Sequence, residues 1–276
     1  MLFKNKYIKF IDIIFLLLSF IFLLLLSLFL RKNLSLNELL FINLSFILII
    51  FVILQIYRKI INKFNLELNK LSGEILISGL HLNIPPVFTE WTIDSDLLKI
   101  IIDDIYNKKY NINILELGTG LSTIVLSKIL NKLNNGKLYS IEHDRIFYEK
   151  TKKLLELNKL DNICDLFFSP LEDVYINGIK WTWYNIYFLS KVNNIDILII
   201  DGPPAYIQKM SRFPALPILI DKLNYNISIY LDDGNREDEK KIIREWKNLY
   251  KELNFEFINT FKGAWYICYE NKFKNN

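Results

Sequence analysis

Short apolar runs of strand length alternate with helix-like segments from about residue 85 onward, and this alternation limits the possible folds more than any other feature of the chain. The strand-like runs cover residues 112–117, 137–142, 163–169, 195–201 and 227–233. The helix-like segments cover residues 121–133, 145–160, 212–224 and 236–253, and another runs from Asp94 or Ser95 to Lys109. Strands that alternate with helices predict an α/β domain in which a parallel sheet is covered on both faces.

The last two strand-like runs, residues 255–260 and 264–270, break this alternation. Only the tripeptide FKG separates them. A connection that short cannot form a parallel crossover, so the two runs are predicted to pair as an antiparallel hairpin at the edge of the sheet.

Acidic residues and glycines follow four of the five strand-like runs. The first run ends in Glu116-Leu-Gly-Thr-Gly120, the second in Glu142-His-Asp, the fourth in Asp201-Gly-Pro-Pro and the fifth in Asp232-Asp-Gly. In open parallel sheets, ligands bind outside the carboxyl ends of the strands. These strand ends are therefore the expected functional site.

The stretch ELGTGLS, residues 116–122, is typical of a strand-to-helix turn that binds a nucleoside. Gly118 and Gly120 let the backbone turn tightly and approach a ligand, and the following helix offers free N–H groups. Glu142, at the end of the next strand, is placed to accept the hydroxyls of a ribose. The third glycine of a dinucleotide fingerprint is absent, and an anionic Glu116 would repel phosphate and suit a cationic sulfonium or ammonium group. A dehydrogenase is therefore disfavoured.

Four motifs together, ILELGTGLST, YSIEHD, IDILIIDGPP and IYLDDGNRE, resemble the class I S-adenosylmethionine-dependent methyltransferases over about residues 85–270. The resemblance implies a Rossmann-like seven-stranded sheet with one antiparallel strand, and S-adenosylmethionine as cofactor. It implies that these residues line the cofactor: Glu116, Gly118, Thr119, Gly120, Ser122, Glu142, His143, Ser169, Leu171 and Asp201. Within that set, Ser169 and Leu171, with Glu172, would approach the adenine, and Asp201 would lie beside the transferred methyl group.

A looser resemblance to the catechol-type O-methyltransferases gives a hypothesis of metal binding. Asp201, Asp232 and Asp233 fall where that family binds magnesium, whereas its catalytic lysine has no clear counterpart here. Asp232 has an alternative role as the cap of the following turn, and Asp233-Gly234 is a common turn pair.

Three residues are candidates for the base that deprotonates the acceptor: Asp201, Asp232 and His143. His143 has the alternative, which we favour, of an exposed residue at a strand end. The aromatic segment 181–188, with Trp181, Trp183 and Tyr184, is either a wall for the acceptor or a flap packed on the sheet edge. Arg212 either binds an anionic group of the acceptor or is a surface residue at a helix start.

The N-terminal region has a different character, and it accounts for the positive mean hydropathy of +0.19. Residues 13–30 and 39–57 are two runs without charge, each long enough to cross a bilayer. We predict a transmembrane hairpin over residues 1–57, with spans at about 10–30 and 39–57. The first run is too long for a signal peptide and has no small-residue cleavage site, and the second has the alternative of a buried core helix.

Charge gives the expected orientation. Residues 1–72 hold nine basic and three acidic residues, whereas the remainder holds 25 and 27, for a net charge of +4 overall. Three basic residues precede the first span and three follow the second, whereas the link between the spans holds only Arg31 and Lys32. This asymmetry predicts that both ends face the cytoplasm. Residues 58–84 are interpreted as an amphipathic juxtamembrane helix or a plain linker, and residues 85–276 as the methyltransferase domain. The domain lacks the basic surplus of nucleic-acid-binding proteins.

The expected function is therefore a multi-pass membrane methyltransferase with a cytoplasmic catalytic domain. It would act on an oxygen or nitrogen atom of a small-molecule, glycan or lipid-linked acceptor. The alternatives are an aminopropyl transferase of the same fold and a non-catalytic cofactor-binding scaffold. Two histidines leave little room for a zinc site or a Ser-His-Asp triad. Cys164 and Cys268 are expected to be buried thiols in a reducing compartment.

Overall fold

The computed structural model of the chain describes residues 35–269 together with Ser19, Ile21 and Phe22. It divides into two compact units, residues 1–68 and residues 69–276. The second unit begins before residue 85, where the sequence placed the domain boundary, because Ile77 is buried in its core and Leu76, Leu80 and Leu82 pack beside it.

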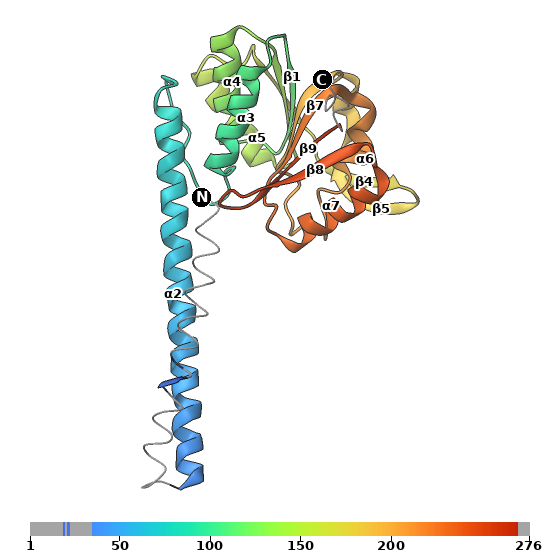
Figure 1. Ribbon diagram of the computed structural model, residues 1–276. Coiled ribbons are helices and arrows are strands. Elements are labelled where there is room, and N and C mark those ends of the chain that lie inside the picture. The colour runs from blue at the N-terminus through green and yellow to red at the C-terminus, as the bar shows by residue number, and fades with distance from the viewer. Residues whose placement is uncertain (1–18, 20, 23–34, 270–276) are drawn as a thin grey trace, which may run out of the picture. The chain divides into compact units, whose positions relative to one another are not determined.

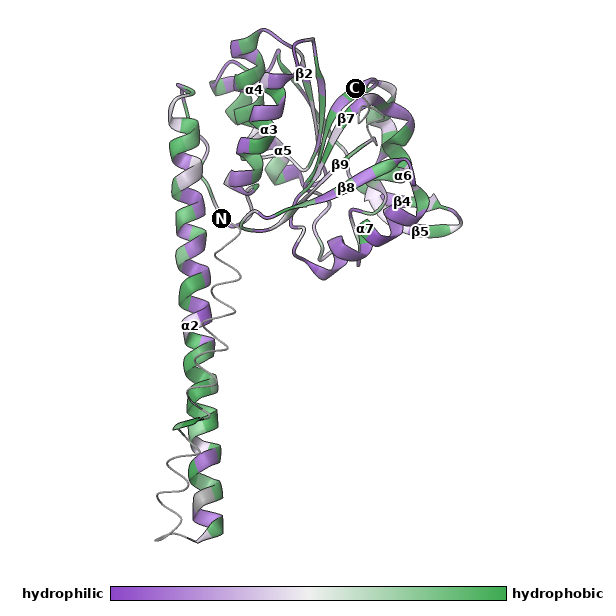
Figure 2. Cartoon of the chain, in the orientation of Figure 1, coloured by the Kyte–Doolittle hydropathy of each residue, from purple (hydrophilic) through white to green (hydrophobic). Residues whose placement is uncertain are grey.

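The first unit contains most of one long helix, α2 (Leu36–Ser78). It is long and apolar enough to cross a membrane, and its apolar window is not buried against other described residues. Figure 2 shows that apolar residues predominate along this part of the helix. The exposure disfavours the alternative of a buried core helix for residues 39–57. The first predicted span lies outside the described residues, apart from positions 19, 21 and 22, which are helical.

The second unit is a seven-stranded sheet with helices on both faces (Figure 1). Its strands are β1 (Asn113–Leu117), β2 (Lys137–Glu142), β3 (Cys164–Phe168), β6 (Ile195–Ile200), β7 (Leu223–Leu231), β8 (Leu253–Ile258) and β9 (Ala264–Tyr269). The spatial order is β3-β2-β1-β6-β7-β9-β8. The first five pair in parallel, and β9 is antiparallel to both β7 and β8. The predicted parallel sheet and antiparallel terminal hairpin are confirmed.

The helices are α3 (Ser95–Asn107), α4 (Leu121–Leu133), α5 (Arg145–Leu157), α6 (Ala215–Leu219) and α7 (Glu237–Leu249), with 3-10 turns η1 (Ile186–Ser190) and η2 (Ile220–Lys222). Two cores form because alternate side chains of each strand point to opposite faces. Ile114 and Ile197 pack under α3 and α4, whereas Leu115 and Leu198 pack under α6 and α7. The predicted helix 212–224 is shorter in the structure, where Pro214 is the N-cap of α6 and η2 follows α6 directly.

One element differs from the sequence analysis. Residues 171–184 form a separate antiparallel hairpin of β4 (Leu171–Ile176) and β5 (Ile179–Tyr184). Asn177 and Gly178 both have positive φ in its two-residue turn, as an Asn-Gly hairpin turn requires. The aromatic segment is thus partly a strand of this hairpin.

Candidate functional site

Two adjoining cavities, each of about 310 Å³, lie at the carboxyl ends of β1, β2 and β6. We call the first the Glu142 cavity, because Glu142, His143 and Gly118 border it, and the second the Lys150 cavity. Thr119 and Asp201 border both. Two of the acidic residues that the sequence singled out at strand ends, Glu142 and Asp201, thus border the cavities, and Asp232 and Asp233 lie close to Asp201.

The two glycines after β1, Gly118 and Gly120, lie in different surroundings, and a side chain at each position would have a different effect. Gly118 has φ of 97°, and a Cβ there would lie 3.2 Å from the backbone carbon and oxygen of Asp201. A Cβ on Gly120 would meet no protein atom, and Gly120 borders the Lys150 cavity. Gly118 therefore permits close packing of two strand ends, whereas Gly120 leaves open space beside the first turn of α4.

Glu116 lies beneath this loop and borders neither cavity. Its Oε2 accepts hydrogen bonds from Thr123 Oγ1 at 2.6 Å and from Ser140 Oγ at 2.7 Å, and Thr123 Oγ1 in turn accepts the N–H of Gly120. Burial raises the pKa of Glu116 to about 7 against the hydrogen bonds that lower it. This differs from the expected anion in contact with the cofactor: Glu116 shapes the loop from below through Thr123.

Glu142 borders its cavity with a carboxylate that already has four protein donors. Oε2 accepts the N–H and hydroxyl of Thr119 at 3.0 and 3.2 Å. Oε1 accepts the N–H groups of His143 and Asp144, both at 2.8 Å. Burial raises the pKa of Glu142, but His143 and these backbone N–H groups outweigh it, so the net shift is downward. Glu142 is therefore an anion at neutral pH.

The other expected cofactor residues are divided by the structure. His143 borders the Glu142 cavity, with Nδ1 2.9 Å from Glu142 Oε1, and Ser122 borders the Lys150 cavity. Ser169 is buried, and its N–H bonds to the carbonyl of Glu142, while Leu171 pairs with Tyr184 in the hairpin. Neither Ser169 nor Leu171 borders the two cavities. The structure therefore gives the adenine assignment no direct support.

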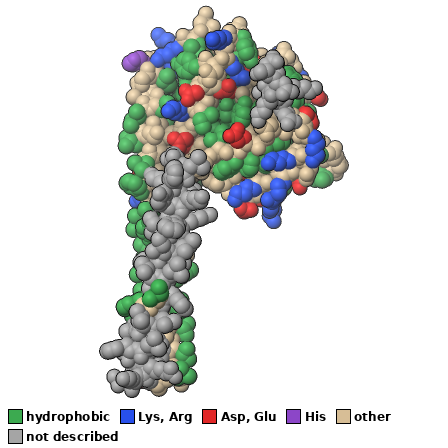
Figure 3. Space-filling model, in the orientation of Figure 1, with side chains coloured by type: hydrophobic (Ala, Val, Ile, Leu, Met, Phe, Trp, Pro, Cys, Tyr) green, Lys and Arg blue, Asp and Glu red, His purple; other side chains and the backbone are tan. Residues whose placement is uncertain are grey.

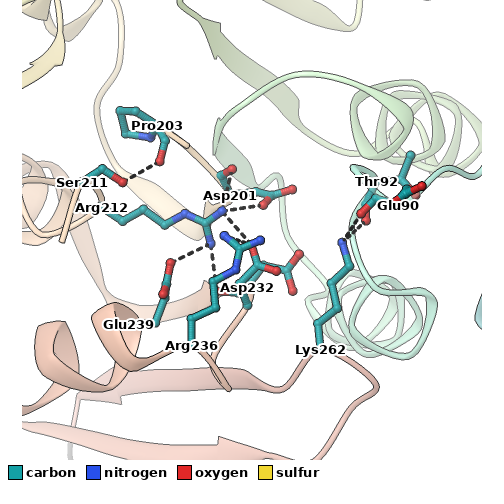
Figure 4. Close-up of polar contacts among 11 residues, drawn as sticks. Glu90, Thr92, Asp201, Pro203, Ser211, Arg212, Asp232, Arg236, Glu239 and Lys262 are labelled. Atoms are coloured by element: carbon teal, nitrogen blue, oxygen red, sulfur yellow. Dashed lines mark hydrogen bonds and ion pairs between the residues drawn. The ribbon is translucent and has the colours of Figure 1, made fainter. Parts of the chain in front are cut away.

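A buried arginine joins the acidic ends of β6 and β7 (Figure 4). Arg212, 3% exposed, donates to Asp201 Oδ1 at 3.0 Å and to Asp233 Oδ2 at 2.9 Å. It also donates to the carbonyls of Asp201 and Asp232, and its Nη1 lies 3.7 Å from Glu239. The oxygen atoms that the Arg212 guanidinium contacts are thus all protein atoms. The expected role of Arg212 in binding an anionic acceptor is corrected, because its guanidinium is buried and already paired.

Asp201 and Asp232 differ in their access to ligand. Asp201 borders both cavities, and burial raises its pKa to about 6 although Arg212 lowers it. Asp232 is 1% exposed and borders neither cavity. Burial and the charge of Asp201 raise its pKa well above its usual value. Asp232 is therefore not placed to act as a base on a bound acceptor.

Magnesium does not fit this cluster. Oxygen atoms of Asp201, Asp232 and Asp233 lie within 4.8 Å of one another, which is a spacing that a cation would suit. However, two of these carboxylates already share the Arg212 guanidinium, and Asp233 also pairs with Arg236 at 2.9 Å. Magnesium needs an octahedral shell of oxygen atoms, several of them water. The charge that compensates the aspartates is supplied by arginine instead, contrary to the magnesium hypothesis.

The aromatic segment contributes less to the cavities than expected. Trp183 is fully buried in the core, and Trp181 stacks on Phe213 with ring centroids 4.7 Å apart. Only Tyr184 borders a cavity among these three, and its buried hydroxyl has no hydrogen-bond partner among the described residues. Trp181 and Trp183 are corrected to packing residues, whereas Tyr184 retains a polar group available to a ligand.

Several cavity residues were not found by sequence reasoning. Trp91, Phe147 and Lys150 border the Lys150 cavity. Trp91 belongs to a segment without regular secondary structure, and the other two lie on α5, where their spacing resembles that of an ordinary surface helix. Pro85-Pro86 was the available indication that residues 84–93 do not continue the preceding helix.

Comparison with known proteins shows likeness in structure alone. No protein-family model and no curated protein matches the sequence. The Podospora anserina methyltransferase PaMTH1, bound to SAH, is 11% identical and matches with a TM-score of 0.51 over 66% of this chain and 81% of its own. The O-methyltransferase TomG of Streptomyces achromogenes, in complex with SAM, is 12% identical with a TM-score of 0.50, over 75% of this chain and 89% of its own. The sheet-containing unit therefore has the fold of the class I S-adenosylmethionine-dependent methyltransferases, as the sequence resemblance implied.

Proposed function

We propose that the chain is an S-adenosylmethionine-dependent methyltransferase that acts on an oxygen or nitrogen atom of its acceptor. One observation carries the proposal: the glycine loop, the anionic Glu142 and Asp201 border one cavity at the strand ends of a methyltransferase fold. The open space beside Gly120 and the unpartnered hydroxyl of Tyr184 support a ligand in this region.

Binding of a ribose diol to Glu142 requires an exchange of hydrogen bonds. A carboxylate has about four lone-pair sites, and all four protein donors are already in place. The Thr119 hydroxyl is the donor that can leave, since its Oγ1 lies 3.2 Å from the hydroxyl of Thr151. The backbone N–H groups stay, so the carboxylate keeps its orientation when a ribose hydroxyl replaces Thr119 Oγ1.

The residues around Asp201 suit proton transfer from an acceptor. S-adenosylmethionine supplies a methyl group already activated by its sulfonium charge, so positioning of the acceptor provides much of the rate. Asp201 borders both cavities and has a pKa of about 6, near the value that favours a general base at neutral pH. Arg212 fixes Asp201 Oδ1, which leaves Oδ2 to face the acceptor.

The test is calorimetry of cofactor binding. Glu142→Ala is expected to weaken binding of both S-adenosylmethionine and its demethylated product by about 1.5–3 kcal/mol, roughly 10- to 150-fold, because the charge-assisted hydrogen bond to the ribose is lost. Glu149→Ala is the control, since Glu149 is a half-exposed partner of Arg145 on α5. Unchanged affinity in a folded Glu142→Ala variant would remove the ribose assignment.

We further propose that the first unit attaches the enzyme to a membrane, with both termini in the cytoplasm. The exposed apolar stretch of α2 supports one span, and the ring of Phe22, 6.3 Å from that of Phe46, supports a second helix beside it. The flanking basic residues support the orientation.

Labelling of intact cells with an impermeant maleimide tests this topology. Asn33→Cys is expected to react and Asn275→Cys is not, with the unaltered chain as control for the two native cysteines. Reaction at position 275 without reaction at 33 would reverse the assigned orientation.

A further inference from the structure

The Lys150 cavity has a largely apolar wall that is partly exposed to solvent. Ile84, Pro86 and Val87 contribute from the segment before α3, and Trp91 follows with 73% of its surface exposed. Phe147 and Leu154 contribute from α5. Large exposed apolar side chains around one cavity indicate a binding surface. A volume of about 310 Å³ suits a small molecule.

The segment of residues 84–93, which forms one side of the wall, is held at its first residues by contacts with the end of α5. The N–H of Ile84 donates to Asn158 Oδ1 at 3.1 Å, and Asn158 Nδ2 donates back to the carbonyl of Ile84 at 2.9 Å. Asn83 also donates to the carbonyl of Leu157. The beginning of the segment is therefore attached to the same helix that carries Phe147 and Lys150.

The same segment is held at its last residues by the loop between β8 and β9. Lys262 Nζ donates to the carbonyls of Glu90 and Thr92 at 2.9 and 2.8 Å, on either side of Trp91 (Figure 4). Asp94, which is fully buried, accepts the N–H of Lys262 at 2.7 Å and caps α3. Trp91 is thus presented by a fixed turn, despite its exposure.

The charged groups of the cavity are few and of opposite sign. Lys150, on α5, has no hydrogen bond or ion pair with any residue in the described part of the chain, and Asp201 borders the same cavity. Thr119 and Asp201 connect it to the Glu142 cavity. A ligand here would meet an apolar wall, one cation and the carboxylate assigned above as the base.

We propose that the Lys150 cavity is the acceptor site, and that it takes a small amphipathic molecule with an apolar body and a single anionic group. This rests on the proposed function. The anionic group pairs with Lys150, the apolar body lies against Trp91 and Phe147, and the nucleophilic atom points to Asp201. Basic and acidic side chains are interspersed across the visible face of the sheet-containing unit (Figure 3). The preference for an anion rests on Lys150, which is the basic residue among those that border the cavity.

Titration with two matched probes tests the site. The full chain in lipid nanodiscs, saturated with the demethylated cofactor, is titrated with phenylbutyrate and with its uncharged analogue phenylbutanol, and empty nanodiscs are subtracted. Lys150→Met is expected to weaken phenylbutyrate about 2- to 5-fold and leave phenylbutanol unchanged, because a partly exposed ion pair contributes little. Trp91→Ala is expected to weaken both probes about tenfold through lost apolar contact.

Two exposed residues away from the cavity serve as controls. Lys152→Met, on the same helix as Lys150, and Tyr175→Ala, on the β4–β5 hairpin, should change neither probe. Binding of both probes unchanged in Lys150→Met and Trp91→Ala would overturn the acceptor site, while cofactor binding in the same samples would leave the proposed function standing. Absence of cofactor binding in the unaltered chain would overturn the proposed function itself.

Discussion

Replacing Arg212 by methionine is expected to lower the free energy of unfolding by about 3–5 kcal/mol, the range observed when one partner of a buried ion pair is removed. The side chain of Arg212 is 3% exposed and connects Asp201 to Asp233 at 3.0 and 2.9 Å. Methionine retains much of the volume but none of the donors. Asp201 and Asp233 would then lose a buried cation, and the carbonyls of Asp201 and Asp232 would lose their guanidinium donor.

Arg236→Met is the matched control for this experiment. Arg236 pairs with the same Asp233 at 2.9 Å, but 46% of its side chain is exposed, so its loss should cost at most about 1 kcal/mol. Urea denaturation followed by tryptophan fluorescence measures both variants. Equal and small losses would show that the acidic cluster does not depend on its internal cation, and would restore the case for a bound metal.

Glu116→Gln is expected to remove about 2–3 kcal/mol of pH dependence from stability between pH 5 and pH 8. The pKa of Glu116 is raised from 4.5 to about 7 in the folded chain, so the native state holds a proton that the unfolded state has released. Stability from this group is therefore greatest at low pH and falls as the pH rises through 7. Glutamine cannot titrate, and its amide oxygen can still accept from Thr123 and Ser140.

The free energy of unfolding is measured for the variant and for the unaltered chain at each pH, and the difference between the two values is compared across the pH range. This difference cancels the contributions of Asp201 and Asp232, whose pKa values are also raised by burial. The exposed Glu149→Gln provides the baseline. Parallel pH profiles for Glu116→Gln and the unaltered chain would show that Glu116 does not take up a proton in the folded state over this range, and would contradict the prediction.

The sheet could be predicted because two local features of the sequence determine it: the spacing of the apolar residues and the length of the connections between the runs. Alternate apolar runs fixed β1, β2 and β6 within about a residue of their ends, and the tripeptide FKG allowed only an antiparallel pair. The hairpin of β4 and β5 was missed although Asn177-Gly178 is a strong hairpin turn. Its aromatic residues were interpreted as a possible wall for the acceptor. Trp183 is instead buried in the core, and this burial depends on tertiary packing that the local sequence does not show.

The roles of the charged groups were less predictable, since they depend on which elements meet. The sequence placed Asp201, Asp232 and Asp233 at neighbouring strand ends, and the structure brings them together. Nothing in the local pattern around Arg212 indicates that residues between β6 and α6 turn back to pair with these aspartates. Likewise, Lys262 and Trp91 lie far apart in the chain, and only the completed sheet brings the lysine to the carbonyls of Glu90 and Thr92.

The position of β9 has a consequence for the order in which the site is completed during synthesis. Among the described residues β9 comes last in sequence, yet it lies inside the sheet between β7 and β8, and Lys262 lies two residues before its start. A nascent chain that ends before this point can form β1, β2 and β6 with the glycine loop, but it lacks Lys262, whose ammonium bonds to the carbonyls on either side of Trp91. The residues of the wall are synthesised before any strand of the sheet, and the contacts of Lys262 with this segment form only after the β8–β9 loop has been made.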